Sequence, residues 1–144
     1  MRAVLDTNVV ASSTLSRTSP PAQILERLQR RQFELVVSTA LFAEYERVLR
    51  YPHIRARNGF DDSLIAAQLK TLRKLSSPVE PDFSIDVVKD DPDDNRVLEC
   101  ALTGAVGVIV SGDKHLRRLV VFEGIPILLP AAFLAVLDAD DEIT

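Results

Sequence analysis

Two aspartates closely follow short apolar runs, where a carboxylate can take part in chemistry at the edge of a sheet. Asp6 follows the apolar run at residues 3–5, and Asp113 comes shortly after the run at residues 108–110. Each run is typical of a buried strand, and in parallel sheets functional groups gather beyond the carboxyl ends of the strands. Taken singly, either acid could equally be a turn residue or a helix N-cap.

A third acid, Glu44, falls on the apolar face of a predicted helix. At about 100° per residue, Glu44 in a helix predicted over 39–50 aligns with Leu41 and Val48, whereas Glu46 points the opposite way. A carboxylate on such a face lies at its wet margin or is paired with a cation. The structural alternative for Glu44 is therefore an internal salt bridge.

The fourth acid, Asp94, repeats this pattern in a helix predicted to follow Asp91 and Pro92. We expect Asp91 at the N-cap and Pro92 at the first helical position, which suits a proline. Asp94 then aligns with the apolar positions 98, 101 and 105, while Asp93 and Glu99 fall off that face. The alternative for Asp94 is that it complements the helix dipole and bonds back to the cap.

These four carboxylates, Asp6, Glu44, Asp94 and Asp113, could all converge at one edge of the sheet. Two carboxylates about 4 Å apart repel each other by roughly 4 kcal/mol at an effective dielectric of about 20, so such a cluster is either partly protonated or built around a cation. Oxygen ligands suit Mg²⁺ or Mn²⁺, and the one cysteine and two histidines show no zinc-ligand spacing. The usual use of such a site is phosphoryl transfer or phosphodiester hydrolysis.

The elements that must position these acids alternate along the chain. Apolar runs predict strands at 3–5, 33–37, 108–110 and 125–129, and helical patterns begin at residue 20, run over 39–50 and 61–75, begin again at 92, and cover 131–137. A short helix is expected around residue 116, and residues 76–91 are expected to form a loop with an extended piece at 85–88. Such alternation predicts an α/β/α sandwich, in which helices cover both faces of a central parallel sheet.

Length and composition limit the architecture and the setting. The chain has 144 residues, which suits one domain, here expected over residues 1–137, followed by an acidic tail at 138–144. The single cysteine excludes an internal disulfide, and the N-terminal apolar run is too short for a signal peptide. No window approaches the roughly 20 apolar residues that span a bilayer. We therefore expect a cytoplasmic protein with no membrane partner.

The charge balance bears on nucleic-acid binding. With 21 acids against 17 bases the net charge is −4, which by itself argues against contacts to phosphates. The bases nevertheless cluster, and bound divalent cations would reverse the local charge at an acidic site. Lys114 and Arg117 are candidates to contact a scissile phosphate, although the simpler interpretation of each is a residue of the solvated surface.

At these acids the chain resembles the PIN-domain family. The resemblance is carried by four segments in order: residues 4–9 (VLDTNV), residues 38–49 around Glu44, residues 90–101 (DDPDDNRVLECA) and residues 110–116 (VSGDKHL). It runs from residue 1 to about residue 137. More narrowly, the residues of these motifs and the length of the chain are similar to those of the toxin components of bacterial toxin–antitoxin pairs.

The resemblance implies an α/β/α fold and a Mg²⁺- or Mn²⁺-dependent endoribonuclease that hydrolyses RNA. It implies metal-binding and catalytic roles for the four acids named above, with Asp91 as a further candidate ligand and Thr7 or Asn8 as a polar helper. It also implies an antitoxin partner, whose basic residue would reach the acids. A homodimer through the helix at 61–75 is a further expectation.

Two other functions are weighed against this one. A phosphatase similar to the haloacid dehalogenases would use Asp6 as a nucleophile and a second aspartate two residues later, but that position is Asn8. A catalytically weak PIN-like module that binds RNA or protein would be indicated by the loss of site acids, yet all four are present. Metal-dependent cleavage of RNA by the purified protein separates these readings.

Overall fold

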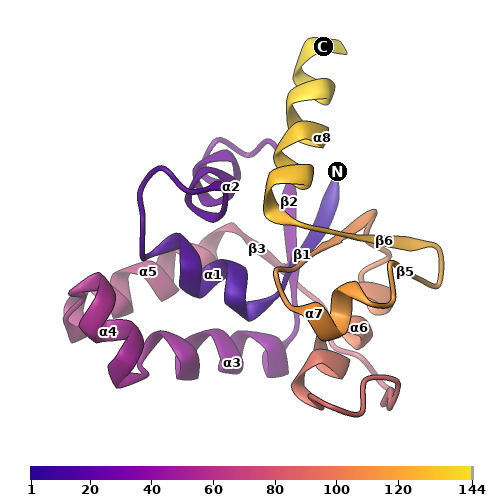
Figure 1. Ribbon diagram of the computed structural model, residues 1–144, viewed down its shortest axis with the longest axis horizontal. Helices are drawn as coiled ribbons and strands as arrows, with labels where there is room; N and C mark the ends of the chain where they lie inside the picture. The colour runs from indigo at the N-terminus through magenta and orange to yellow at the C-terminus, as the bar shows by residue number, and fades with distance from the viewer. Residues whose placement is uncertain (144) are drawn as a thin grey trace.

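A computed structural model describes residues 1–143 and shows one mostly parallel six-stranded sheet between helices (Figure 1). The strand order is β3-β2-β1-β4-β6-β5, and only β5 is antiparallel to its neighbour. The strands are β1 (Arg2–Leu5), β2 (Glu34–Val37), β3 (Ser76–Pro78), β4 (Val108–Val110), β5 (Val121–Phe122) and β6 (Ile125–Leu128). The predicted α/β class is confirmed, with the short β5 as an antiparallel addition.

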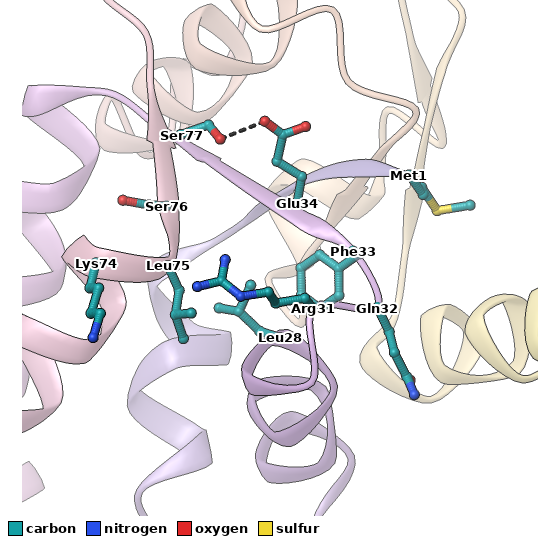
Figure 2. Close-up of a pocket in the computed structure, with 10 residues that line it drawn as sticks. All are labelled: Met1, Leu28, Arg31, Gln32, Phe33, Glu34, Lys74, Leu75, Ser76 and Ser77. Carbon is teal, nitrogen blue, oxygen red and sulfur yellow. Dashed lines mark hydrogen bonds between the residues drawn. The ribbon is translucent and has the colours of Figure 1, made fainter.

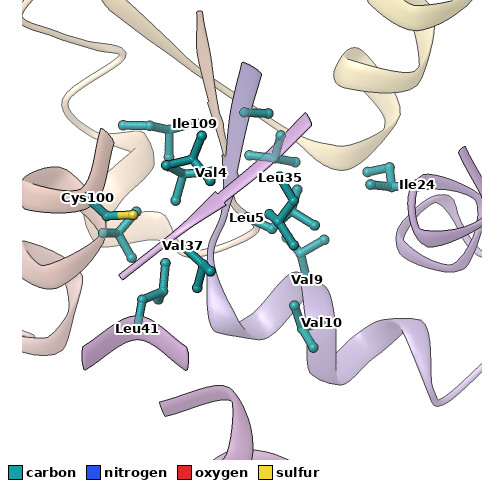
Figure 3. Packing of buried hydrophobic residues seen from close by; sticks show 14 of the residues in the cluster. Val4, Leu5, Val9, Val10, Ile24, Leu35, Val37, Leu41, Cys100 and Ile109 are labelled. Carbon is teal, nitrogen blue, oxygen red and sulfur yellow. The ribbon is translucent and has the colours of Figure 1, made fainter. Parts of the chain in front are cut away.

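Eight helices surround the sheet within the described residues. They are α1 (Thr7–Ser13), α2 (Pro20–Gln29), α3 (Thr39–Leu49), α4 (Pro52–Asn58), α5 (Asp62–Leu75), α6 (Asp93–Thr103), α7 (Lys114–Arg117) and α8 (Pro130–Ile143). Figure 3 shows Ile24 of α2 and Cys100 of α6 on opposite sides of the strands. The sheet is therefore the middle of three layers.

The central strands are apolar throughout because both of their faces are covered. Ala3, Val4 and Leu5 have no exposed surface, and Ile109 of β4 is equally buried. Helix α6 approaches the sheet closely where it ends, since a Cβ built on Gly104 would lie only 2.5 Å from Val36 Cγ1. The absence of a side chain at this position allows the helix to pack against β2.

Several predicted helix starts are confirmed with their capping bonds. Ser38 accepts a hydrogen bond from the Leu41 amide and begins α3, and Asp61 does the same for the Leu64 amide in α5. These caps satisfy amides that have no partner inside the helix. The caps matter for the site, because α3 carries Glu44.

Four elements in the structure were not predicted from the sequence. Helix α1 is rich in β-branched and small residues, which favour helices weakly, but it buries Val9 and Val10 in the core. Helix α4 begins at Pro52, where the preceding helix was expected to end. Strands β3 and β5 are only three and two residues long. Burial of the two valines stabilises α1, and pairing with β2 and β6 stabilises β3 and β5.

Some predicted boundaries were wrong. Helix α6 begins at Asp93 with Pro92 as its N-cap, one position later than expected. Residues 85–88 form no strand. Helix α8 continues to Ile143 instead of ending at residue 137, and residue 144 lies outside the described residues. The division into a domain at 1–137 and an acidic tail at 138–144 stays a prediction. Asp138, in this longer helix, forms an ion pair with Arg27 of α2.

None of the described helices combines the length and apolar character that crossing a bilayer requires.

Candidate functional site

The register between β1 and β4 brings two of the predicted acids to the same edge of the sheet. Leu5 is paired with Val110 in these parallel neighbours, and the Asp6 amide donates to the Val110 carbonyl at 2.9 Å. The chain therefore leaves both strands at the same level, with Asp6 after one and Asp113 shortly after the other. Asp6 is 4% exposed.

The Asp6 carboxylate is held by hydrogen bonds on both oxygens. Oδ1 accepts from the Thr7 amide at 2.8 Å, and Oδ2 accepts from Asn8 Nδ2 at 3.0 Å and from Ser111 Oγ at 2.7 Å. Asn8 Oδ1 in turn accepts from the Gly112 amide at 3.1 Å. Asn8 and Ser111 thus tie the two strand ends together around Asp6. Ser111, which is fully buried, was not singled out from the sequence.

Three aspartates converge more closely than the other acids. Asp91, Asp94 and Asp113 each offer a carboxylate oxygen, and these oxygens all lie within 4.8 Å of one another. Asp91 Oδ1 accepts from the Asp93 amide at 3.2 Å, and Asp113 Oδ1 accepts from the His115 amide at 2.7 Å. Asp91 and Asp113 therefore act as local caps and also belong to the cluster. The cluster has the size and the oxygen donors that a metal ion requires.

Asp6 and Glu44 line the same cleft as this cluster. Together with Asp91, Asp94 and Asp113 they surround a cavity of about 180 Å³, which Thr7, Asn8 and Val48 complete. Glu44 lies at the margin of the buried face of α3, where Leu41 and Tyr45 face the core. The four predicted acids and Asp91 are thus brought together around one cleft.

A buried oxygen without a partner indicates that the cleft can accept a cation. Asp94 is 4% exposed, and its Oδ2 atom has no hydrogen-bond partner among the described residues. Buried polar atoms without partners are rare and costly. The donor set fits a hard divalent ion, which would satisfy Asp94.

Burial and mutual repulsion raise the pKa of three acids. Burial, followed by the charges of Asp6, Asp113 and Asp91, raises the pKa of Asp94 to about 8. Burial and then the charges of Asp93 and Asp6 raise the pKa of Glu44 to about 7. For Asp6, burial outweighs the hydrogen bonds that oppose it, and its pKa rises to about 6.

These shifts have a direct consequence for the site. Burial and repulsion favour a proton within the cluster near neutral pH unless a cation takes its place.

Two polar residues of α6 hold the loop that delivers Asp91. Asn95 is 2% exposed; its Oδ1 accepts from the Val87 and Val88 amides at 3.0 and 2.8 Å, and its Nδ2 donates to the Val88 carbonyl at 2.9 Å. Glu99 accepts from the Ile85 amide at 2.7 Å. Glu99 is 6% exposed although helical spacing puts it off the face that carries Asp94, because the loop at 85–88 covers it. These bonds take the place of strand pairing along residues 85–88.

The predicted phosphate contacts stand apart from the cleft. Lys114 and Arg117 are exposed on α7, and neither is among the described residues that line the cavity of the five acids. Their role in binding RNA stays a prediction.

A different hollow, of about 430 Å³, lies at the opposite, amino edge of the sheet (Figure 2). Its one acid, Glu34, accepts a hydrogen bond from Ser77 and lies 3.7 Å from Arg2. Arg31 and Lys74 also line it. With a single, paired carboxylate, this hollow lacks the donor set of a metal site.

The fold and cleft define an α/β/α domain with a carboxylate site at the carboxyl edge of a mostly parallel sheet. The family model for the PIN domain matches residues 2–115. The chain belongs to the PIN-domain family. PIN domains are generally nucleases, and the cluster of Asp91, Asp94 and Asp113 could hold a metal ion.

Two solved structures share the fold at low sequence identity. PAE2754 from Pyrobaculum aerophilum has a TM-score of 0.64 and 17% identity, covering 96% of this chain and 90% of that one. VapBC2 from Rickettsia felis, bound to a DNA fragment from its promoter, has a TM-score of 0.57 and 11% identity, covering 90% and 98%. A comparison with curated proteins gives no match.

Proposed function

We propose that this PIN-domain protein is a Mg²⁺- or Mn²⁺-dependent endoribonuclease that hydrolyses RNA phosphodiester bonds. The observation that carries the proposal is the convergence of Asp91, Asp94 and Asp113 within 4.8 Å, in a cleft that Asp6 and Glu44 also line. Bound divalent ions would supply an activated water and neutralise charge on the leaving oxygen. One or two ions are compatible with five carboxylates.

The residues of the cleft would have different roles in metal binding and catalysis. Asp91, Asp94 and Asp113 would be the principal metal ligands, because their oxygens lie closest together. Asp6 would contact the ion from a fixed position, because its oxygens already accept three hydrogen bonds that orient the carboxylate. Glu44, at the margin of α3, is placed to bind a second ion or to accept a proton near neutral pH, in accord with its pKa of about 7. Asn8 supports Asp6 from the side.

The decisive experiment is cleavage of labelled single-stranded RNA by the purified protein with Mg²⁺, with Mn²⁺ or with EDTA. We expect metal-dependent cleavage that Asp94→Asn and Asp113→Asn each reduce at least a hundredfold. The matched control is Asp82→Asn, which removes an exposed acid outside the cleft. RNA that binds but is not cleaved with either metal would favour the catalytically weak binding module instead.

We further propose that the protein is the toxin of a toxin–antitoxin pair and acts in the cytoplasm. The resemblance of its four motifs to such toxins and the fold shared with VapBC2 support this proposal. The partner would be a small antitoxin whose Arg or Lys reaches the acid cleft, since a guanidinium can bridge two carboxylates. Growth arrest on induction, relieved by Asp113→Asn, is the expected result; normal growth of cells with the wild-type chain and no partner gene would contradict it.

A homodimer is also proposed, although α5 offers less apolar surface than the sequence suggested. Ile65, Leu69 and Leu72 pack into the core, and Leu64 is left 51% exposed. Light scattering at micromolar concentration, with Leu64→Asp as the variant, tests whether this helix pairs two copies. A monomer mass for the wild-type protein would contradict the proposal.

A further inference from the structure

Another hollow is lined by segments of the chain that flank two acids of the carboxylate cleft. It has a volume of about 250 Å³ and lies between the loop at residues 87–90 and helix α7 with the residues after it. Asp90, which lines the hollow, directly precedes Asp91 of the cluster, and His115 follows Asp113 by two residues. The hollow and the cleft have no lining residue in common, but two segments of the chain pass from one directly to the other, at residues 90–91 and 113–115.

Three nitrogen-bearing side chains line this hollow, and they come from two separate segments. Lys89 belongs to the loop, whereas His115 and Arg118 belong to α7 and its C-cap. Arg118 Nη1 lies 3.7 Å from Asp90 Oδ2, and His115 Nδ1 lies 3.4 Å from the same oxygen. One carboxylate oxygen thus faces two basic groups at once, which is the arrangement that a phosphate oxygen would also take.

The ion pairs in the hollow are exposed and therefore exchangeable. The side chains of Arg118 and Asp90 are 64% and 66% exposed, and those of Lys89 and Asp86, which pair at 2.6 Å, are 70% and 79% exposed. Exposed pairs contribute little to stability. Arg118 and Lys89 can therefore turn toward an incoming phosphate without a large loss of folding stability.

The loop that forms one wall of the hollow has a backbone fixed by hydrogen bonds. The backbone of Val87 and Val88 is fixed by three hydrogen bonds to Asn95, which is 2% exposed. Lys89 and Asp90 follow this fixed segment directly. Their backbone is therefore carried at a defined place beside the cluster, which lowers the entropic cost of binding there.

We propose that this hollow binds a phosphate of the RNA strand adjacent to the one that is cleaved, with Arg118 as the main contact and Lys89 as the second. This inference rests on the proposed function. In the metal-free protein the five carboxylates of the neighbouring cleft repel the strand, so a cationic contact beside them helps to hold it. Arginine suits this role because its guanidinium binds phosphate oxygens in pairs.

The test measures binding of fluorescent single-stranded RNA in EDTA, in the background Asp94→Asn, so that neither metal nor cleavage contributes. We expect Arg118→Ala to weaken binding roughly fivefold to tenfold and to lower the slope of log affinity against log salt by about 0.7. The matched control is Arg30→Ala, since Arg30 is an arginine 59% exposed that also pairs with one acid, Glu26, but ends α2 at the amino edge of the sheet. The RNA affinity of Arg30→Ala should stay within twofold of that of the Asp94→Asn background.

Two further measurements identify the contact. Asp90→Asn should tighten RNA binding, because it removes the carboxylate that occupies the basic groups. An RNA with one neutral methylphosphonate linkage, moved along the strand, should lose affinity for the wild-type hollow at one linkage only, and Arg118→Ala should abolish that loss.

The outcomes separate the two proposals. Equal RNA affinity in Arg118→Ala and Arg30→Ala, or weaker binding in Asp90→Asn, would overturn the phosphate site while leaving the nuclease proposal in place. RNA that binds none of the variants, together with no cleavage by the wild-type protein, would instead refute the proposed function itself.

Discussion

Replacing Asp94 by asparagine should stabilise the metal-free protein, although it removes a residue of the proposed active site. Asp94 is 4% exposed and its pKa is raised to about 8, first by burial and then by the charges of Asp6, Asp113 and Asp91. Asparagine has nearly the same shape and carries no charge. The variant therefore removes the repulsion and leaves the packing in place.

The sign and size of the effect follow from the pKa. Because the folded pKa lies above the ordinary value of 3.8, the folded state binds the proton more tightly, and the stability of the wild-type protein falls as pH rises from about 4 to about 8. One pKa unit corresponds to about 1.4 kcal/mol, and the neighbouring acids share the cost, so we expect Asp94→Asn to gain roughly 1–3 kcal/mol at pH 8. The lost interaction with the dipole of α6 offsets only about 0.5 kcal/mol.

The assay is urea unfolding followed by circular dichroism in EDTA, from pH 4 to pH 9. The advantage of Asp94→Asn should be near zero at pH 4, grow with pH and level off above pH 8, while Asp82→Asn follows the wild-type curve. Adding Mn²⁺ at a hundred times its dissociation constant should stabilise the wild-type protein by about 2.7 kcal/mol and the variant far less. A variant less stable than the wild-type protein at pH 8 would refute the electrostatic reasoning.

Three further predictions concern the same site. Mn²⁺ affinity measured by calorimetry should rise between pH 6 and pH 8, because metal binding must displace protons from acids whose pKa values are raised; a pH-independent affinity would contradict those pKa values. Asn95→Ala should lose roughly 2–3 kcal/mol of unfolding free energy and bind Mn²⁺ more weakly than an equally destabilised Leu72→Ala, since Asn95 fixes the loop before Asp91. Tyr45→Phe should lose about 1–2 kcal/mol in the urea assay, because its hydroxyl donates to the Leu5 carbonyl at 2.5 Å; an unchanged midpoint would show that this bond adds nothing.

The sequence determined the class of fold and most of the acids of the site. Short apolar runs alternating with helical patterns require a sheet covered on both faces, and this pattern is visible without any long-range information. Asp6 and Asp113 could be assigned to the carboxyl edge of the sheet, because each closely follows a buried strand and the carboxyl ends of parallel strands meet at that edge. Asp94 could be singled out because helical spacing puts a charge on an apolar face.

Tertiary structure alone decided which acids come closest together. Asp91 was interpreted chiefly as a cap, and it does accept the Asp93 amide, but its position in the cluster depends on the loop that Asn95 and Glu99 hold. The side chains that clamp this loop lie in the next helix, and no local pattern marks them as partners of the backbone at 85–88. The role of Ser111 is equally non-local, because it arises only when the register of β1 and β4 sets its hydroxyl beside Asp6, 105 residues away in the chain. Periodicity reports which face a residue occupies, whereas distances between carboxylates depend on strand register and loop anchoring, which only the folded chain defines.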